Sequence, residues 1–133
     1  MIVDANVWVS LFVRSDVFHP RCRLWIRAQL AGGVTLVIPS LAVAEVAGSV
    51  ARVRNSSHRG RRVARWLLES PAVDVVTLHD AIVHRAAEIA ADYQIRGSDS
   101  VYVAVAEDLG LPLVTLDQEL QARAAAIVNV IHP

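Results

Sequence analysis

The chain opens with Met1-Ile2-Val3-Asp4-Ala5-Asn6-Val7, a short apolar run that ends at an acidic residue. A run of β-branched residues followed by polar ones is typical of a strand that enters a turn or a helix. Comparable runs recur along the chain, and we expect strands over Ile2–Ala5, Val34–Ile38, Val73–Thr77, Leu113–Thr115 and Ile127–Val130. Because these runs are apolar throughout, they favour strands that are covered on both faces.

Longer segments with helical periodicity separate the expected strands. Besides a short helix after the first strand, they predict helices over Phe18–Ala31, Ser40 to about Val53, Gly60–Glu69, Asp80–Tyr93, Ser98–Leu109 and Asp117 to about Ala124. This alternation predicts an α/β fold, a three-layer αβα sandwich with a mostly parallel central sheet of about five strands. No repeat or linker divides the chain, so we expect one domain over residues 1–133.

The composition excludes several classes of protein. With 54% hydrophobic and 20% charged residues in 133, the chain can bury one core and is not disordered. Its apolar stretches are too short to cross a bilayer and its first residues lack a secretory signal pattern, so we expect a cytoplasmic protein without membrane contact. Cys22 is the only cysteine, and no His or Cys cluster has zinc spacing. Neither an internal disulfide nor zinc is therefore expected.

The zero net charge conceals a marked asymmetry along the chain. Residues 1–66 contain ten arginines and three acidic residues, whereas residues 67–133 contain three arginines and ten acidic residues. We therefore expect the two halves to attract each other. The chain has no lysine, which excludes mechanisms that need an ammonium group, such as a phosphate-loop lysine or a Schiff base.

Four acidic residues stand in apolar surroundings. They are Asp4 and Asp117 after predicted strands, Asp99 at a helix start, and Glu45 inside an apolar helix. Helix capping is a simpler interpretation for each aspartate, with Thr115 and Gln118 as a capping box beside Asp117. For Glu45 the simpler interpretation is a surface position. Taken together, however, the four residues favour a shared site.

Parallel sheets place their sites at the carboxyl ends of strands, near the point where the strand order reverses. Carboxylates that converge there repel one another unless their pKa values rise or cations lie between them. Oxygen ligands favour Mg²⁺ or Mn²⁺, which activate water and stabilise the leaving oxygen of a phosphodiester. The pattern predicts metal-dependent hydrolysis of nucleic acid. This prediction requires that the four acidic residues lie together in one pocket and that they are not each neutralised by an arginine.

The same four motifs resemble those of the PIN domain family, and their placement is similar to that in VapC-type toxin ribonucleases of bacterial toxin–antitoxin pairs. The resemblance covers nearly the whole chain and is carried by Val3-Asp4-Ala5-Asn6-Val7, Pro39–Val46, Asp99–Ala106 and Thr115–Leu120. Each motif is short, and it is their order and spacing that is specific. Ser100 departs from the pattern, because many relatives carry Ala there.

This resemblance implies a Mg²⁺- or Mn²⁺-dependent endoribonuclease that forms a homodimer and is neutralised by a cognate antitoxin. We predict that the catalytic residues are Asp4, Glu45, Asp99 and Asp117. Asp4, Asp99 and Asp117 are the expected metal ligands, and Glu45 is expected to hold a metal-bound water or a second ion. Asn6 and Thr115 are expected to orient the carboxylates.

A basic stretch without an acidic residue follows Glu45. We predict that it binds RNA phosphates through Arg52, Arg54, Arg59, Arg61, Arg62 and Arg65. The alternative is a solvated helical hairpin that pairs with the acidic second half of the chain. The three tryptophans are candidates for base stacking, although packing is favoured for Trp25 and Trp66. Trp8 and Phe12 are also candidates for contact with a partner chain.

Two other functions stay open at this point. One is a catalytically silent PIN-fold module that binds RNA or protein, against which the presence of all four acidic residues argues. The other is an aspartate-based phosphotransfer enzyme with Asp4 as its nucleophile. Position 6 is Asn where a second Asp would be expected, and the missing lysine also argues against phosphotransfer.

Overall fold

The central sheet has five strands, all parallel, in the order β3-β2-β1-β4-β5. In the computed structural model, which describes residues 1–133, the strands are β1 (Ile2–Val3), β2 (Leu36–Pro39), β3 (Val73–Val76), β4 (Leu113–Val114) and β5 (Val130–Ile131). The predicted α/β class is confirmed, and the sheet is parallel throughout. The three central strands β2, β1 and β4 are fully buried because their side chains are apolar on both faces, whereas the edge strands β3 and β5 are partly exposed.

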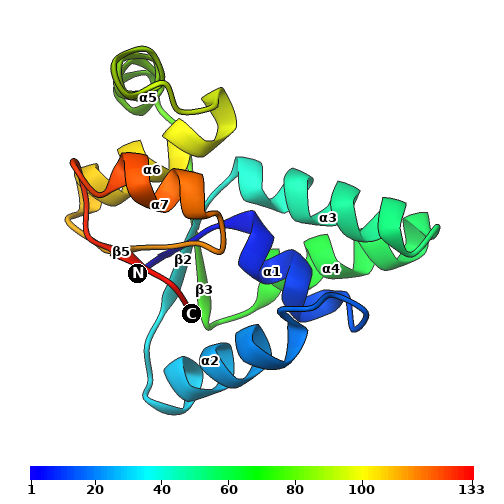
Figure 1. The fold of residues 1–133 in the computed structure, drawn as a ribbon. Helices are drawn as coiled ribbons and strands as arrows, with labels where there is room; N and C mark the ends of the chain where they lie inside the picture. Colours follow the sequence, from blue (N-terminus) through cyan, green and yellow to red (C-terminus); the bar gives the residue numbers. More distant parts are fainter.

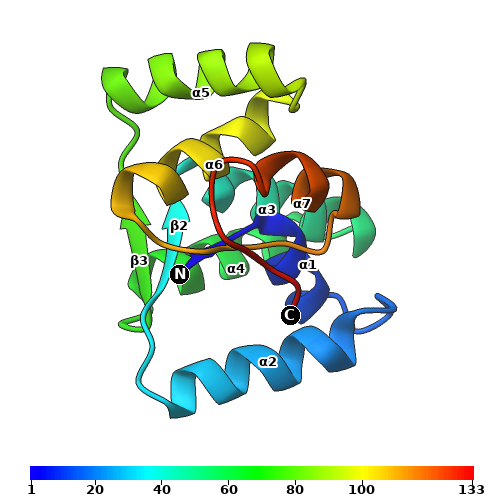
Figure 2. The same cartoon turned by 60° about the vertical axis from the view of Figure 1, so that its left-hand side comes forward.

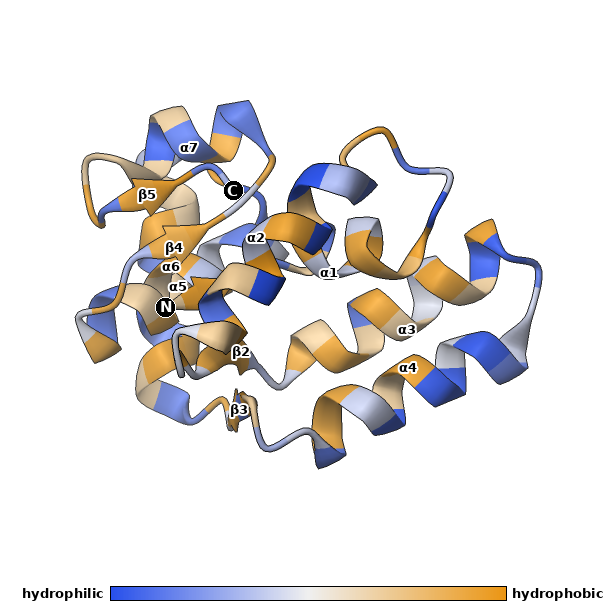
Figure 3. Ribbon diagram, turned by 90° about the horizontal axis from the view of Figure 1, so that it is seen from below, coloured by the Kyte–Doolittle hydropathy of each residue, from blue (hydrophilic) through white to orange (hydrophobic).

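Seven helices surround the sheet. They are α1 (Ala5–Phe12), α2 (His19–Ala31), α3 (Leu41–Val53), α4 (Ser57–Glu69), α5 (Asp80–Tyr93), α6 (Gly97–Leu109) and α7 (Gln118–Ala124). Helices α1, α3 and α4 lie on one side of the strands and α5 and α6 on the other (Figures 1 and 3). Helix α6 packs directly on β1, β2 and β4, and α5 packs on α6 as an outer element (Figure 2). None of the helices has the length and apolar character needed to span a membrane.

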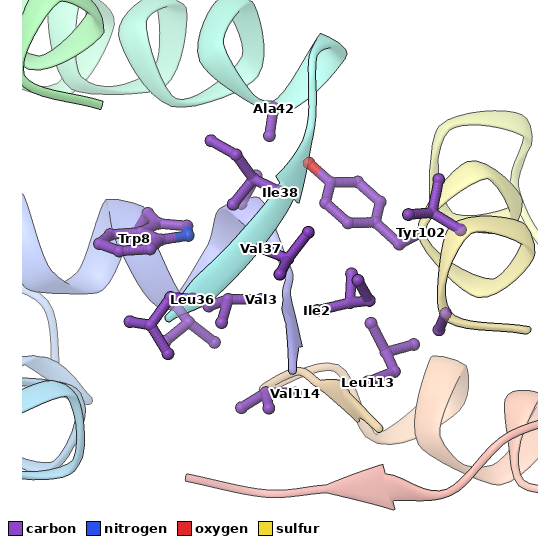
Figure 4. Close-up of a cluster of buried hydrophobic side chains, with 14 of the residues drawn as sticks. Ile2, Val3, Trp8, Leu36, Val37, Ile38, Ala42, Tyr102, Leu113 and Val114 are labelled. Carbon is purple, nitrogen blue, oxygen red and sulfur yellow. The ribbon is translucent and has the colours of Figure 1, made fainter. Parts of the chain in front are cut away.

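The core contains two large side chains that come from opposite sides of the sheet. Trp8 of α1 and Tyr102 of α6 are both fully buried among the strand residues (Figure 4). Trp8 therefore cannot stack on RNA bases or contact a partner chain, so both suggestions are wrong for this residue. Trp66 is partly exposed and packs against Trp8 and Phe12, with ring centroids 5.8 and 5.5 Å away. Trp25 is half-buried against the core.

Most predicted boundaries agree with the structure to within two residues, and two differ by three. Helix α4 begins at Ser57 and not at Gly60, because the Ser56 side chain accepts a hydrogen bond from the Arg59 N–H and caps the helix one turn earlier. The last strand begins at Val130 and not at Ile127. Backbone N–H groups of Ile127 and Val128 still donate to the Ala124 carbonyl, so these residues continue the turn after α7.

Gly60 lies where α4 comes closest to α3, so replacing it with Ala should destabilise the protein. A Cβ atom at this position would lie 2.6 Å from the Ala47 carbonyl oxygen and 2.9 Å from the Ala51 Cβ. Overpacking costs about 1–3 kcal/mol, and a contact with a rigid backbone oxygen belongs to the upper part of this range, above the roughly 1 kcal/mol that Ala gains over Gly in a helix. We expect Gly60→Ala to lower the free energy of unfolding in urea by about 1 kcal/mol or more. In the control Gly97→Ala the added methyl meets open space, and an equal loss there would contradict this explanation.

Candidate metal centre

The strand order reverses between β1 and β4, the two strands beside each other at the centre of the sheet. Val3 pairs with Val114 in parallel register, so the residues that follow them leave the same edge of the sheet together. Asp4 and Thr115 consequently lie side by side, although 111 positions separate them in the sequence. This is the edge at which open α/β sheets place ligand sites.

Asp4 is a buried carboxylate held by three hydrogen bonds. Its Oδ2 accepts from the Thr115 hydroxyl at 2.6 Å and from the Asn6 side-chain amide at 2.6 Å, and its Oδ1 accepts from the Asn6 backbone N–H at 3.3 Å. Only 5% of the residue is exposed. Burial raises the pKa of Asp4 to about 6, the hydrogen bonds oppose this rise, and the charges of Asp99 and Glu45 add to it. A cation beside Asp4 would favour its ionised form.

The raised pKa of Asp4 predicts how stability depends on pH. Folding raises this pKa from 3.8 to about 6, so protonation stabilises the folded state. The stabilisation is complete below pH 3.8 and is lost as the pH rises through 6. In EDTA, the free energy of unfolding of the wild type should rise by about 1 kcal/mol relative to Asp4→Asn between pH 7 and pH 5. Urea unfolding at the two pH values measures this difference, and parallel pH dependence of the two proteins would contradict it.

Asn6 and Thr115 connect Asp4 to the start of α7. Asn6 donates to the Thr115 hydroxyl oxygen and accepts from the Leu116 N–H, while Thr115 accepts from the Asp117 N–H. The predicted capping box of Thr115 and Gln118 is wrong. Asp117 itself caps α7 by accepting from the N–H groups of Glu119 and Leu120, whereas the Thr115 hydroxyl is directed to Asp4.

The structure brings all four sequence-predicted acidic residues to one cavity. This cavity, of about 590 Å³, is lined by Asp4, Glu45, Asp99 and Asp117 together with Asn6 and Arg96. The four carboxylates come from the end of β1, from α3, from the first turn of α6 and from the cap of α7. Asp16, which the sequence analysis did not single out, also lines the cavity and accepts from the Phe18 N–H.

Arg96 compensates two of the four charges. Its Nε donates to Asp99 Oδ2 at 2.7 Å and its Nη2 donates to Asp117 Oδ2 at 2.6 Å. Hydrogen bonding to Asp99 raises the pKa of Arg96. In this arrangement no three carboxylates of the structure are grouped closely enough to hold one ion. This arginine was not predicted from the sequence, although it lies three residues before Asp99 at a helix start, which is a recognised pairing distance.

The residues present nevertheless fit a hard divalent cation in their chemistry. Every anionic group in the cavity is a carboxylate, and Asp4 is buried beside two others that raise its pKa. The Arg96 side chain is 73% exposed, so it can turn into solvent without breaking core packing. Asp4, Asp99 and Asp117 are the residues that would hold an ion once Arg96 leaves. Binding of a metal ion at this site therefore requires that the ion displace the Arg96 guanidinium.

Tyr102 is a residue of this site that the sequence analysis missed. Its hydroxyl donates to Glu45 Oε2 at 2.5 Å, and Figure 4 shows it extending from α6 past β2 toward α3. Burial and the bond to Glu45 raise the pKa of Tyr102, so it stays a donor. Glu45 is half-buried in the cavity wall with one oxygen fixed in place. The only local signal is that Tyr102 lies three residues after Asp99 on α6, which places the two on one helix face.

The basic stretch covers the end of α3, the turn after it and most of α4, and none of its arginines is paired with an acidic residue. All five ion pairs in the structure lie within residues 67–133 and involve Arg85, Arg96 or Arg123. The expectation that the halves of the chain attract each other is therefore not met by ion pairing, and the alternative of a hairpin paired with the acidic half is wrong. Arg52 bonds to Ser49, while Arg54, Arg59 and Arg62 line a cavity that Arg61 and Arg65 do not reach.

Comparisons with known proteins agree with this architecture. Residues 1–126 match the PIN domain family. The fold is similar to VapC20 of Mycobacterium tuberculosis, a sarcin–ricin loop cleaving toxin, at a TM-score of 0.80 and 19% identity over 99% of this chain and 98% of that one. FitAcB of Neisseria gonorrhoeae has a TM-score of 0.74 and 18% identity over 98% and 95% of the chains. VapBC2 of Rickettsia felis, bound to a promoter DNA fragment, has a TM-score of 0.71 and 14% identity over 98% and 96%. No curated protein matches in sequence.

Proposed function

Because the chain belongs to the PIN domain family, we propose that it is a divalent-metal-dependent endoribonuclease and the toxin of a toxin–antitoxin pair. The observation that carries the proposal is the convergence of Asp4, Glu45, Asp99 and Asp117 in one cavity at the switch point of the sheet. A buried carboxylate with a pKa of about 6 beside other carboxylates is typical of a functional site. The whole chain, residues 1–133, is proposed to act as a single nuclease domain.

In this proposal Asp4, Asp99 and Asp117 hold the ion, for which Mg²⁺ or Mn²⁺ is the candidate. When bound, such an ion stabilises negative charge on the phosphate and lowers the pKa of water. Asn6 and Thr115 hold the Asp4 carboxylate in one orientation through the bonds to its oxygens. Glu45, oriented by Tyr102, accepts the proton of the water that attacks the phosphorus in line with the leaving oxygen.

The partners are proposed on the same grounds. The similar structures include one described as a toxin, one described as a toxin–antitoxin complex and one bound to a fragment of promoter DNA, which supports a cognate antitoxin as the partner of this chain. A homodimer is proposed from the family resemblance. Exposed apolar side chains on α2 and α4, including Leu24 and Leu68, are available for such an interface.

The proposal is tested by incubating the purified full chain with labelled single-stranded RNA. Cleavage should require Mg²⁺ or Mn²⁺, should stop in EDTA and should return when the ion is restored. RNA that stays intact under all three conditions would favour the second candidate, a silent module that binds RNA or protein. The specific observation in favour of that candidate is the pairing of Arg96 with both Asp99 and Asp117.

Tyr102→Phe should reduce catalysis without weakening RNA binding. The substitution keeps the buried ring but removes the hydrogen bond to Glu45, whose net contribution is about 1 kcal/mol, so kcat should fall about fivefold. KM for RNA should change by less than about twofold, because Tyr102 is fully buried and therefore out of reach of the RNA. Steady-state kinetics separates the two constants. A rise in KM at constant kcat would contradict a role in positioning Glu45.

A further inference from the structure

A second cavity, of about 550 Å³, lies between the end of α1 and the α3–α4 hairpin. Its lining includes four arginines and one histidine, Arg14, Arg54, His58, Arg59 and Arg62. Phe12 and two valines form its apolar wall. We refer to it as the arginine cavity. Arg14 comes from outside the basic stretch of the sequence and joins it only in the folded chain.

The charge of the arginine cavity is uncompensated. No acidic residue lines it, and none of its four arginines takes part in an ion pair. Guanidinium groups directed into one space repel each other, and an anion between them removes that repulsion. Their planar forks match the oxygens of a phosphate, to which they donate in pairs. The cavity therefore has the composition of a phosphate site.

The arginine cavity and the acidic cavity share two walls. Helix α1 provides Ser10 to the acidic cavity, and the residues that follow it provide Arg14 to the arginine cavity. Along α3, Glu45 and Ser49 line the acidic cavity, while Arg54 at the helix end lines the other. Nine residues separate Glu45 from Arg54, a rise of about 14 Å along the helix. At a rise of roughly 3.4 Å per stacked nucleotide, this span corresponds to about four nucleotides.

We propose that the arginine cavity binds backbone phosphates of the RNA strand whose cleaved bond lies in the acidic cavity, a few nucleotides away. This inference rests on the proposed ribonuclease function. An acidic segment of a protein partner carries negative charge, as RNA does, and could also bind in the arginine cavity. The carboxylates of the acidic cavity would repel it, however, so such a segment does not explain why the two cavities lie next to each other. A strand that must place one phosphate over the carboxylates and extend along α3 meets both cavities in turn.

The test compares two double variants of equal charge on one helix. Arg59→Gln/Arg62→Gln removes two arginines that line the cavity, and Arg61→Gln/Arg65→Gln removes two exposed arginines of α4 that do not. Binding of fluorescent single-stranded RNA is measured by anisotropy in EDTA over a series of salt concentrations. The first variant should lose about tenfold in affinity, and its slope of log K against log salt should fall by about 1.4. The second should lose less than about threefold.

Length dependence provides the second measurement. A dinucleotide whose phosphate occupies the acidic cavity cannot also reach the arginine cavity, so the two variants should cleave it with the same kcat/KM, whereas a longer strand should distinguish them. In cleavage assays the first variant should raise KM for the longer RNA and leave kcat within about twofold.

Equal losses in the two variants would show diffuse attraction and overturn the arginine cavity as a site. An effect of the first variant on binding of polyglutamate but not of RNA would overturn it in favour of an acidic protein segment. These outcomes leave the proposed function intact if the wild type cleaves RNA. A wild type that binds RNA with the predicted difference but never cleaves it would refute the ribonuclease proposal and leave the phosphate site standing.

Discussion

Asp4→Asn and Asp99→Asn should each lower kcat for metal-dependent RNA cleavage by about 10³-fold or more. Both substitutions preserve the shape of the side chain while removing one negative charge from the cavity that the four carboxylates line. Loss of an ion ligand forfeits several kcal/mol of stabilisation of the charge that develops at phosphorus, and each 1.4 kcal/mol corresponds to about tenfold in rate. Cleavage of labelled RNA under single-turnover conditions measures the effect.

The matched control is Asp92→Asn, which removes the same charge from an exposed position on α5. It should cleave RNA at the wild-type rate within about twofold, because Asp92 does not line the cavity and its exposed charge is screened by solvent and salt. Thermal unfolding establishes that the variants are folded. Undiminished turnover by Asp4→Asn or Asp99→Asn in a folded protein would refute the assignment of these residues.

Arg96→Gln should bind divalent cations about tenfold more tightly than the wild type. In the structure the Arg96 guanidinium holds both Asp99 and Asp117, so an incoming ion must displace it. Exposed ion pairs contribute up to about 1 kcal/mol each, and the two pairs together correspond to about tenfold in affinity after screening. Calorimetric titration with Mn²⁺ measures the dissociation constant directly, independently of RNA cleavage.

The same variant should be less heat-stable than the wild type in EDTA, because Asp99 and Asp117 then lose their shared cation. Saturating Mn²⁺ should remove most of this difference. Arg85→Gln is the matched control, since Arg85 also bridges two acidic residues, Glu88 and Glu107, away from the cavity. Its affinity for Mn²⁺ should equal that of the wild type. Unchanged affinity in Arg96→Gln would show that the arginine does not compete for the site.

Most of the fold follows from local sequence. The β-branched runs predict the strands, and the residues that end them, above all Asp4, predict where chemistry would gather, because parallel strands share one carboxyl edge. The final strand is misplaced because Ile127 and Val128 are as apolar as a strand, yet the turn after α7 engages their N–H groups. Apolar character predicts which residues are buried, but it does not predict which of them form the strand; here only Val130 and Ile131 pair with β4.

The parts of the site that sequence did not predict are contacts between distant segments. Tyr102 and Glu45 are 57 residues apart, and no periodicity in either helix indicates that they meet. The pairing of Arg96 with Asp117 spans 21 residues and depends on how α6 and α7 pack. Arg14 joins the basic hairpin only because α1 ends beside it. The four acidic residues were predictable because each belongs to a short local motif, whereas these contacts depend on tertiary packing.

The most direct test of the carboxylate cavity is the anomalous difference map of crystals soaked in Mn²⁺. We predict a peak within coordination distance of oxygens of Asp4, Asp99 and Asp117, with the Arg96 side chain turned away from the last two. A map without a peak in this cavity, with Arg96 still between Asp99 and Asp117 at a saturating Mn²⁺ concentration, would contradict the proposal that these carboxylates form a metal centre.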